Sequence, residues 1–367
     1  MFDIFINNSP TGRVMLPQVE LRQRLEYYFS NVVLIWIALI FYRTNKYYVS
    51  FLRHDTQQLL FWLAAAYTVI GFILYVFMPA KHVRESKGAT LLKILRRLAR
   101  DTKDYIGNFT LRTSQPPPRI DPGEKTVLLF MLVKIFFLPL MINFLFGNFH
   151  DVQNNFRMWQ NHGYALTMPA FNGIIYPLAL ALLLLIDTAY FAFGYSIESS
   201  WLGNKVRSVE PTFFGWMVAL VCYPPFTDVI GNYANWYAND YSQFSTEGLT
   251  FIMRLAVLAL FGIYVSATVA LGAKCSNLTN RGIVSRGPYA IVRHPAYIAK
   301  NLAWWVTVIP VLHITNPAHA AGIVMSMVAW TLIYFLRAIT EERHLIADPE
   351  YQEYAKKVKY RFIPHVF

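Results

Sequence analysis

The chain has 367 residues, of which 55% are apolar, 16% aromatic and only 15% charged. A soluble domain carries about 25% charged residues, so the composition indicates a protein whose solvent is lipid and argues against a soluble enzyme. The net charge of +12 would suit a nucleic-acid-binding protein, but the distribution of the cations along the chain excludes that class, as described below.

Eight apolar stretches predict an all-α, polytopic membrane protein, because a transmembrane helix needs about 20 predominantly apolar residues. The first and seventh stretches are short, and Pro224-Pro225 interrupts the fifth. The predicted spans are 29–43, 58–79, 126–147, 172–196, 213–230, 249–271, 299–313 and 318–338.

Lysines and arginines lie mainly on one side of this predicted topology. With the N-terminus inside, 27 of the 33 fall in inner segments, four in outer loops and two, Lys134 and Arg254, within spans; only the first hairpin lacks a bias. Because cytoplasmic loops carry the excess of Lys and Arg, we expect a multi-pass protein with both termini in the cytoplasm, in a plasma or inner membrane. The cations then face anionic lipid headgroups, and we expect no nucleic-acid partner.

The long inner loop, 80–125, contains a basic amphipathic segment at 91–100. Its leucines and isoleucine share one helical face and its cations cover the rest, which is typical of a helix lying in the membrane plane against anionic lipid. Such a helix could gate or dock a substrate, but a loop that simply rests on the membrane is the more common case. Three prolines, 116–118, predict a stiff connector after it.

Ionisable residues inside predicted spans are costly and often functional. Lys134, Asp187, Arg254 and, near a span end, Asp228 are the candidates. Asp187 and one of the cations could form a buried structural pair, or Asp187 and Arg254 could contact a substrate, and both interpretations stay open. The absence of an internal repeat in the sequence weakens a third interpretation, a transporter built from inverted halves.

The inner segment 198–212 is richer in polar residues than a simple connection needs. Its two carboxylates, Glu198 and Glu210, have basic surroundings in the sequence. The segment could recognise a substrate or staple the loop to the C-terminal region, and stapling is the simpler interpretation.

The segment 287–299 carries the strongest chemical signal. Pro295 suits the first position of a helix, which puts His294 at or near its N-cap, and free backbone N–H groups there favour an anion. Arg293 adds a guanidinium fork. After a predicted hairpin the chain returns to the same membrane face with Glu341-Glu342, which can hold an ammonium group or a ribose diol.

One end of this hairpin therefore suits an anion and the other a cation, as a zwitterionic amino-acid group requires. A lone His-Pro is more often a plain helix start, and a Glu-Glu pair more often a solvated face. Their meeting at one membrane face favours a site. We expect no metal there, because His294 has no second His or Cys at ligand spacing.

Residues 286–299, the hairpin, Glu341-Glu342 and the segments 351–354 and 361–364 together resemble the isoprenylcysteine carboxyl methyltransferase and phospholipid N-methyltransferase superfamily. The resemblance covers about residues 275–367 and implies a lid-covered pocket for S-adenosylmethionine. The residues assigned to the cofactor on this basis are Tyr289, Val292, His294, Pro295, Tyr297, Glu341 and Glu342. Those assigned to catalysis are Arg293, His294 and Arg361. Substrate contacts are assigned to Asn301, Trp304, Arg254 and Asp187.

This resemblance divides the chain in two. Residues 1–271 would form a transmembrane region of six helices whose role is unassigned, and 272–367 a cofactor-binding module with a two-helix hairpin and a cytoplasmic C-terminal helix. Asp348 and Pro349 suit the start of that helix, and Tyr351, Tyr354 and Val358 give it one apolar face.

The implied reaction is transfer of a sulfonium methyl group to a membrane lipid or isoprenoid-type acceptor at the cytoplasmic interface. A carboxylate acceptor needs no general base, whereas an amine or hydroxyl needs one, and His294 or a tyrosine could serve. Two other classes stay open. One is an NADPH-dependent sterol reductase, whose C-terminal pattern is similar but carries an Asp where this chain has Lys300-Asn301. The other is a non-enzymatic lipid transporter.

Overall fold

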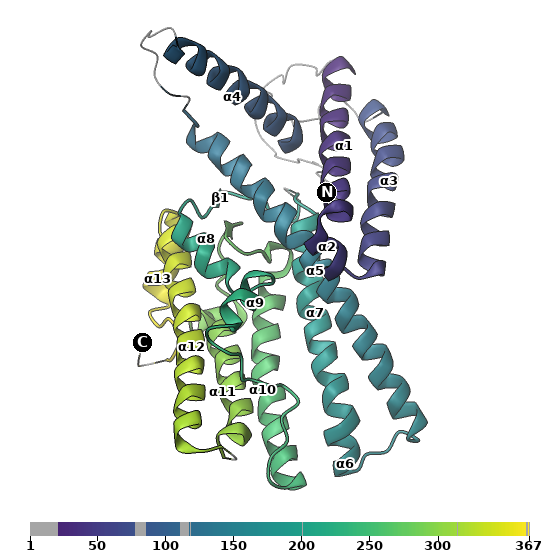
Figure 1. Ribbon diagram of the computed structural model, residues 1–367, viewed down its shortest axis with the longest axis vertical. Helices are drawn as coiled ribbons and strands as arrows, with labels where there is room; N and C mark the ends of the chain where they lie inside the picture. The colour runs from purple at the N-terminus through teal and green to yellow at the C-terminus, as the bar shows by residue number, and fades with distance from the viewer. Residues whose placement is uncertain are drawn as a thin grey trace. The chain divides into compact units, whose positions relative to one another are not determined.

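The computed structural model describes residues 21–77, 86–110, 117, 119–199, 201–313, 315–364 and 366. Most of these residues are helical (Figure 1). Contacts within the chain define two compact units, of which unit 1 is Met1–Asn143 with Tyr195–Val209 and unit 2 is Phe144–Gly194 with Glu210–Phe367. The predicted proline connector lies outside the described residues except for Pro117.

Unit 1 is a group of helices around α1. Its elements are α1 (Leu21–Thr44), α2 (Lys46–Phe51), α3 (His54–Phe77), α4 (Lys87–Thr110), the part of α5 (Pro122–Asn161) up to Asn143, and the short strand β1 (Ser208–Val209). α1 packs against α3 and α4. Asn143 ties α5 to the α2–α3 connection, since its amide donates to the Phe51 carbonyl at 3.2 Å and accepts from Thr56 at 3.1 Å.

The predicted basic helix is present as α4, and its apolar face is only partly free. Leu91 and Ile94 are buried, whereas Leu95 is 46% exposed, because α4 packs against α1. Lys93 and Arg96 are exposed. The helix is confirmed, and its attraction to anionic lipid stays a prediction.

Unit 2 contains the helices of the C-terminal region together with those that precede them. Its elements are the rest of α5, α6 (Met168–Ala170), the π-helix η2 (Phe171–Ile175), α7 (Tyr176–Ser196) up to Gly194, α8 (Phe213–Leu220), α9 (Phe226–Gly231), α10 (Glu247–Leu271), the 3₁₀ turn η3 (Gly272–Lys274), β2 (Thr279–Asn280), the 3₁₀ turn η4 (Gly287–Ala290), α11 (Pro295–His313), α12 (Pro317–Leu345) and α13 (Pro349–Lys357).

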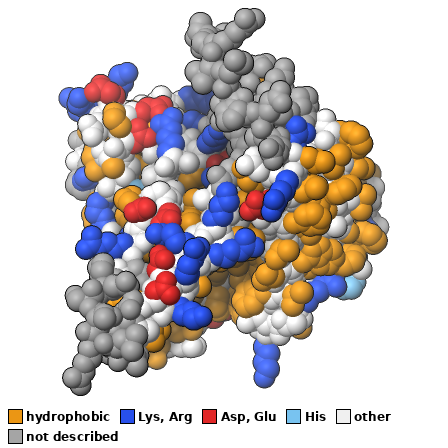
Figure 2. All heavy atoms as spheres, turned by 90° about the horizontal axis from the view of Figure 1, so that it is seen from above, with side chains coloured by type: hydrophobic (Ala, Val, Ile, Leu, Met, Phe, Trp, Pro, Cys, Tyr) orange, Lys and Arg blue, Asp and Glu red, His pale blue; other side chains and the backbone are white. Residues whose placement is uncertain are grey.

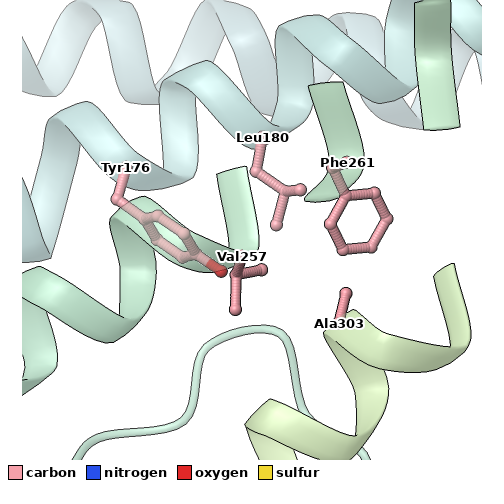
Figure 3. Close-up of a cluster of buried hydrophobic side chains, with 5 residues drawn as sticks. All are labelled: Tyr176, Leu180, Val257, Phe261 and Ala303. Carbon is pink, nitrogen blue, oxygen red and sulfur yellow. The ribbon is translucent and has the colours of Figure 1, made fainter. Parts of the chain in front are cut away.

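The core of unit 2 joins α7, α10 and α11. Figure 3 shows side chains from these helices converging, and all are nearly inaccessible: Tyr176, Leu180, Val257, Phe261 and Ala303. α11 packs against both α10 and α12, and α12 also packs against α8. Ala303 is completely buried, and its small side chain suits a position where α11 meets its neighbours. This packing holds the start of α11, the centre of the predicted site, among α8, α10 and α12.

Six helices in the described ranges are long and apolar enough to cross a membrane. They are Leu21–Thr44, His54–Phe77, Pro122–Asn161, Met168–Ser196, Glu247–Lys274 and Pro317–Leu345. Large apolar side chains on them are exposed, including Trp62 at 65% and Phe77 at 79%, as lipid contact requires. In Figure 2, Lys and Arg side chains lie among Asp and Glu on the face viewed, and apolar side chains cover one flank.

Two predicted spans differ from these helices. The predicted span 213–230 is interrupted at Pro224-Pro225, and the chain there forms the two short helices α8 and α9. The predicted span 299–313 belongs to the 19-residue α11, which is long enough to cross a membrane but less apolar than the other six helices. A multi-pass helical protein is confirmed, whereas the count of eight spans and the cytoplasmic termini stay predictions. The helix of the predicted span 126–147 is longer than expected, because α5 continues to Asn161.

The C-terminal helix α13 begins as predicted. The Asp348 side chain accepts from the Glu350 N–H at 3.0 Å as its N-cap. Tyr351, Tyr354 and Val358 are buried in one cluster, which confirms the predicted apolar face. The functional division at residue 272 stays a prediction.

Candidate active site

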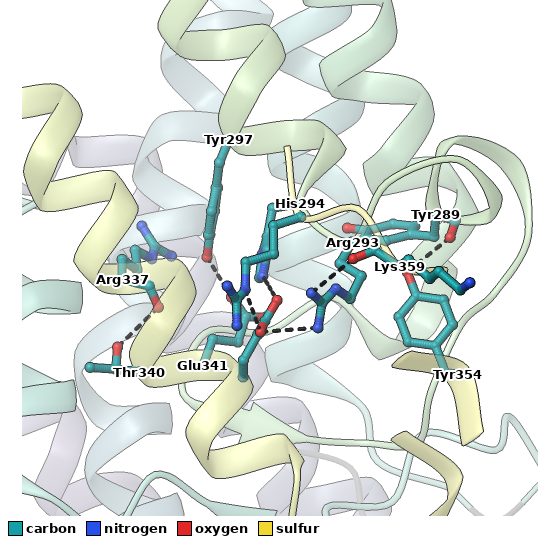
Figure 4. Close-up of polar contacts among 11 residues, drawn as sticks. Tyr289, Arg293, His294, Tyr297, Arg337, Thr340, Glu341, Tyr354 and Lys359 are labelled. Carbon is teal, nitrogen blue, oxygen red and sulfur yellow. Dashed lines mark hydrogen bonds and ion pairs between the residues drawn. The ribbon is translucent and has the colours of Figure 1, made fainter. Parts of the chain in front are cut away.

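A pocket opens within unit 2 among α8, α10, α11 and α12. Five of the predicted site residues line it, namely Tyr289, Arg293, His294, Tyr297 and Glu341. They come from η4, from the connection between η4 and α11, from the first turn of α11 and from the end of α12, so segments about 50 residues apart meet there. Figure 4 shows these side chains around the start of α11.

Local sequence explains where η4 and α11, which form part of the pocket wall, begin. Gly287 has a φ of 61°, a conformation that glycine adopts without steric cost, and η4 starts there. Pro295 is the first residue of α11, as predicted. The carbonyl of His294 accepts from the Ile298 N–H at 3.3 Å, which is the first hydrogen bond of the helix and confirms His294 as its flanking residue.

The C-terminal tail holds this segment from the other side. The backbone N–H groups of Arg293 and His294 donate to the carbonyls of Tyr360 and Arg361, each at 2.9 Å. The Arg293 guanidinium also donates to the Lys359 carbonyl at 3.2 Å. Residues 359–361 therefore set the position of the segment that opens α11.

Glu342 is surrounded by three basic side chains. It accepts from Arg293 at 3.1 Å, from Arg361 at 2.9 Å and from the His294 ring at 3.0 Å. Glu342 is only 8% exposed and is not among the residues that line the pocket. Its charge is committed to holding the tail, α11 and α12 together.

Glu341 has a different environment. It is exposed, lines the pocket and accepts one hydrogen bond from the Tyr297 hydroxyl at 2.7 Å. The Tyr297 ring stacks on the His294 ring with centroids 5.4 Å apart. Of the two carboxylates predicted to hold an ammonium group, Glu341 is the one with room for a ligand.

Arg293 is the cation that would bind the carboxylate end of a zwitterionic group. It lines the pocket, and its Nε is buried and without a hydrogen-bond partner in the described part of the chain. A carboxylate in the pocket would satisfy this donor. The Arg293–Glu341 combination therefore fits the predicted zwitterionic group.

Tyrosines around η4 are held neutral. Partial burial, followed by the nearby Glu341 charge, raises the pKa of Tyr289. Burial likewise raises the pKa of Tyr354, whose hydroxyl donates to the Tyr289 carbonyl at 2.8 Å. Both phenols stay protonated at neutral pH, so they act as hydrogen-bond donors and not as bases.

A second cavity shares four of its lining residues with the pocket. It is lined by Tyr289, Arg293, His294 and Glu341 together with Tyr351 and Tyr354 of α13. The C-terminal helix therefore covers the pocket region from the tail side, as the resemblance implies for a lid.

Several predicted site residues support the pocket without lining it. Val292 and Pro295 are buried beside the α11 start. The Asn301 amide donates to the Tyr297 carbonyl at 2.9 Å. Trp304, 6% exposed, packs edge-on against Trp236 with ring centroids 4.4 Å apart. These positions stabilise α11.

The two predicted intramembrane substrate residues have different outcomes. Arg254 lies near the other end of α10 and donates to the backbone carbonyls of Asn172, Tyr241 and Ser242, so the structure does not bring it to the pocket. Because Arg254 donates to backbone carbonyls, the predicted buried pair between Asp187 and Arg254 is wrong. Asp187 accepts from Tyr264 at 2.8 Å and from Thr268 at 2.5 Å. Both of these donors line the pocket.

Of the remaining charged candidates, Lys134, Asp228 and Glu198 do not line the pocket, whereas Glu210 does. Lys134 belongs to unit 1, where its ammonium lies 5.4 Å from the Phe130 ring centroid. Asp228 is exposed in the first turn of α9. Glu198 pairs with Lys87 at 2.5 Å in unit 1, whereas Glu210 contacts Arg343 of α12 at 3.1 Å. Stapling to the C-terminal region is therefore confirmed for Glu210.

Three further Lys, Arg or Glu residues line the pocket although none was assigned a site role from the sequence: Lys300, Arg337 and Glu210. The Lys300 ammonium lies 5.0 Å from the Tyr264 ring centroid. Arg337 is buried, donates to Asn277 and lies 5.3 Å from the Tyr297 ring centroid. A cation within an apolar helix is the signal that could have identified the first two. Glu210 had none beyond its segment's polarity.

Comparisons with known proteins found one similar family. No curated protein and no solved structure matched the chain. One family model did match, over a segment that includes most of α10 and all of η4, α11 and α12, and therefore most of the pocket wall. The match implies a membrane methyltransferase and confirms the resemblance: residues 249–347 match the isoprenylcysteine carboxyl methyltransferase (ICMT) family.

Proposed function

We propose that this chain transfers a methyl group from S-adenosylmethionine to a lipid or isoprenoid-type acceptor at the cytoplasmic membrane interface. The observation that carries the proposal is the pocket at the start of α11. It presents an arginine with an unpaired buried donor, Arg293, and a carboxylate with room for a ligand, Glu341, within the segment that matches the methyltransferase family.

Different pocket residues would bind different groups of the cofactor. Arg293 would bind the carboxylate of the cofactor's amino-acid end, and Glu341 its ammonium group. The stacked rings of His294 and Tyr297 form the wall between them. The cofactor supplies an activated methyl group on a sulfonium, so the protein's main tasks are alignment and exclusion of water.

The acceptor determines whether a base is needed. A carboxylate acceptor attacks without one, whereas an amine or hydroxyl has to lose a proton. Tyr264 is the tyrosine best placed to pass on such a proton, because it lines the pocket and its hydroxyl already donates to Asp187 at 2.8 Å. We propose Asp187 as a residue on the acceptor side for this reason.

Each unit has features that suit a membrane acceptor. The exposed apolar surface of the long apolar helices suits contact with lipid, from which an amphiphile would enter. The exposed Lys93 and Arg96 of α4 would attract anionic headgroups. The family match favours methyl transfer over the NADPH-dependent reductase and gives no support to a transporter.

Calorimetry on the purified chain in detergent tests the cofactor. We expect binding of S-adenosylmethionine and of S-adenosylhomocysteine, and no binding of NADPH. Glu341→Gln should weaken binding, and Glu353→Gln, the same change on exposed α13, should not. Binding of NADPH alone would overturn the proposal. Incubation of native membranes with labelled methyl donor, followed by identification of the labelled lipid, then tests the acceptor.

A further inference from the structure

Glu210 reaches the pocket from a part of the chain outside the family match. It lies just before α8, is only 2% exposed and lines the same pocket as the residues at the start of α11. Its backbone N–H donates to the Leu278 carbonyl at 2.8 Å. This hydrogen bond anchors the segment before α8 to the loop before η4.

One oxygen of this carboxylate is fully engaged. Glu210 Oε1 accepts from the Thr212 backbone N–H at 3.0 Å, from the Thr212 hydroxyl and from the Arg343 guanidinium at 3.1 Å. Three donors on one oxygen fix the orientation of the whole carboxylate group. The side chain is therefore held in place before any ligand arrives.

The other oxygen has no donor. Glu210 Oε2 is buried and lacks a hydrogen-bond partner in the described part of the chain. A buried acceptor left unsatisfied costs about 1–3 kcal/mol, more for a charged group, so such an atom next to a pocket indicates a missing donor.

Gly215 makes this arrangement possible. A Cβ at position 215 would lie 2.5 Å from both Cγ and Cδ of Glu210, closer than atoms can approach. Only glycine lets the carboxylate lie against the first turn of α8. The sequence thus provides both the charged group and the space for it.

We infer that Glu210 Oε2 accepts a hydrogen bond from the nucleoside half of the bound cofactor, through a ribose hydroxyl or the adenine amino group. The inference rests on the proposed function. The zwitterionic half already has partners in Arg293 and Glu341, so the donors without a partner are those of the nucleoside. The family segment then supplies the amino-acid end of the site, and the preceding segment supplies part of the nucleoside end.

Two ligands separate the two ends of the site. S-adenosylhomocysteine contains both halves, whereas 5′-methylthioadenosine lacks the amino-acid half. Glu210→Gln should weaken the binding of both ligands by the same factor, about tenfold, which is the effect of a hydrogen bond to a charged group. Glu341→Gln should weaken S-adenosylhomocysteine only. Calorimetry on monodisperse, full-length protein in detergent measures the affinity of each variant and of the wild type for both ligands.

Two further variants complete the experiment. Glu210→Asp keeps the charge beside Arg343 but shortens the side chain, so it should also weaken the binding of both ligands. It serves as the test variant if Glu210→Gln fails to fold. Glu353→Gln is the matched control and should bind both as the wild type does. If the wild type binds neither ligand, the proposed function fails. If it binds both and the Glu210 variants bind equally well, only this inference is overturned. A loss confined to S-adenosylhomocysteine would overturn the nucleoside assignment.

Discussion

Glu342→Gln tests whether the carboxylate at the centre of the basic cluster has a structural role. In the wild type, this buried group faces Arg293, His294 and Arg361 at 2.9–3.1 Å. The substitution keeps the side chain's shape and removes its charge. The two guanidinium groups would then face each other without an anion between them.

The cost follows from burial. Breaking a buried pair by removing one partner costs about 3–5 kcal/mol, and exposed pairs contribute about 0–1 kcal/mol. The Arg293 side chain is 12% exposed and that of Arg361 is 33% exposed, so solvent screens part of the loss. We expect the variant to lose about 3 kcal/mol, which is about a hundredfold in the equilibrium that docks residues 359–361 onto α11.

Trypsin reports this docking, because Lys359 and Arg361 are its cleavage sites in the tail. When opening is fast relative to cleavage, the rate follows the open population, so Glu342→Gln should be cut about a hundredfold faster there. Glu353→Gln should be cut at the wild-type rate. Glu341→Gln should also keep the tail protected, because Glu341 is exposed and accepts only from Tyr297. Wild-type cleavage of Glu342→Gln would refute the structural role.

The remaining predictions concern acid stability, the lid and topology. Burial alone would raise the pKa of Glu198, but the Lys87 ammonium at 2.5 Å lowers it overall. The pair therefore stabilises the fold above the unfolded pKa of about 4.3. This stabilisation is lost as the pH falls through the lower pKa of the folded state. Lys87→Met should remove this acid dependence in thermal unfolding, and an unchanged pH profile would contradict it. Tyr354→Phe should loosen α13 by about 1 kcal/mol, because it removes the bond to the Tyr289 carbonyl; hydrogen exchange in α13 measures this. A cysteine at Thr110 should react with impermeant reagents only from the cytoplasmic side, and labelling from outside alone would refute the topology.

Local signals in the sequence predicted much of the site. Pro295 starts α11 and Asp348 caps α13, because proline at a helix start and aspartate at an N-cap act through the backbone within one turn. Long apolar stretches predicted the spanning helices for a similar reason, since hydropathy is a property of the segment itself. The interruption at Pro224-Pro225 was visible in the same way.

Tertiary structure separated residues that the sequence treats as equivalent. Glu341 and Glu342 are neighbours on α12, where consecutive residues point about 100° apart. One therefore faces the pocket and the other the basic cluster. Arg254 and Asp187 are both ionisable residues in apolar helices, yet only the neighbours of Asp187 line the pocket.

The sequence by itself determined the membrane class, the helix that opens the site and the family to which the C-terminal segment is similar, because those signals are local or lie in short motifs. Only the tertiary structure decided which carboxylate is available to a ligand. It also showed that Glu210 joins the pocket through a contact with Arg343, 133 residues further along the chain. The sequence predicted that this segment is stapled to the C-terminal region, but the partner and the position in the pocket depend on how α8 packs against α12.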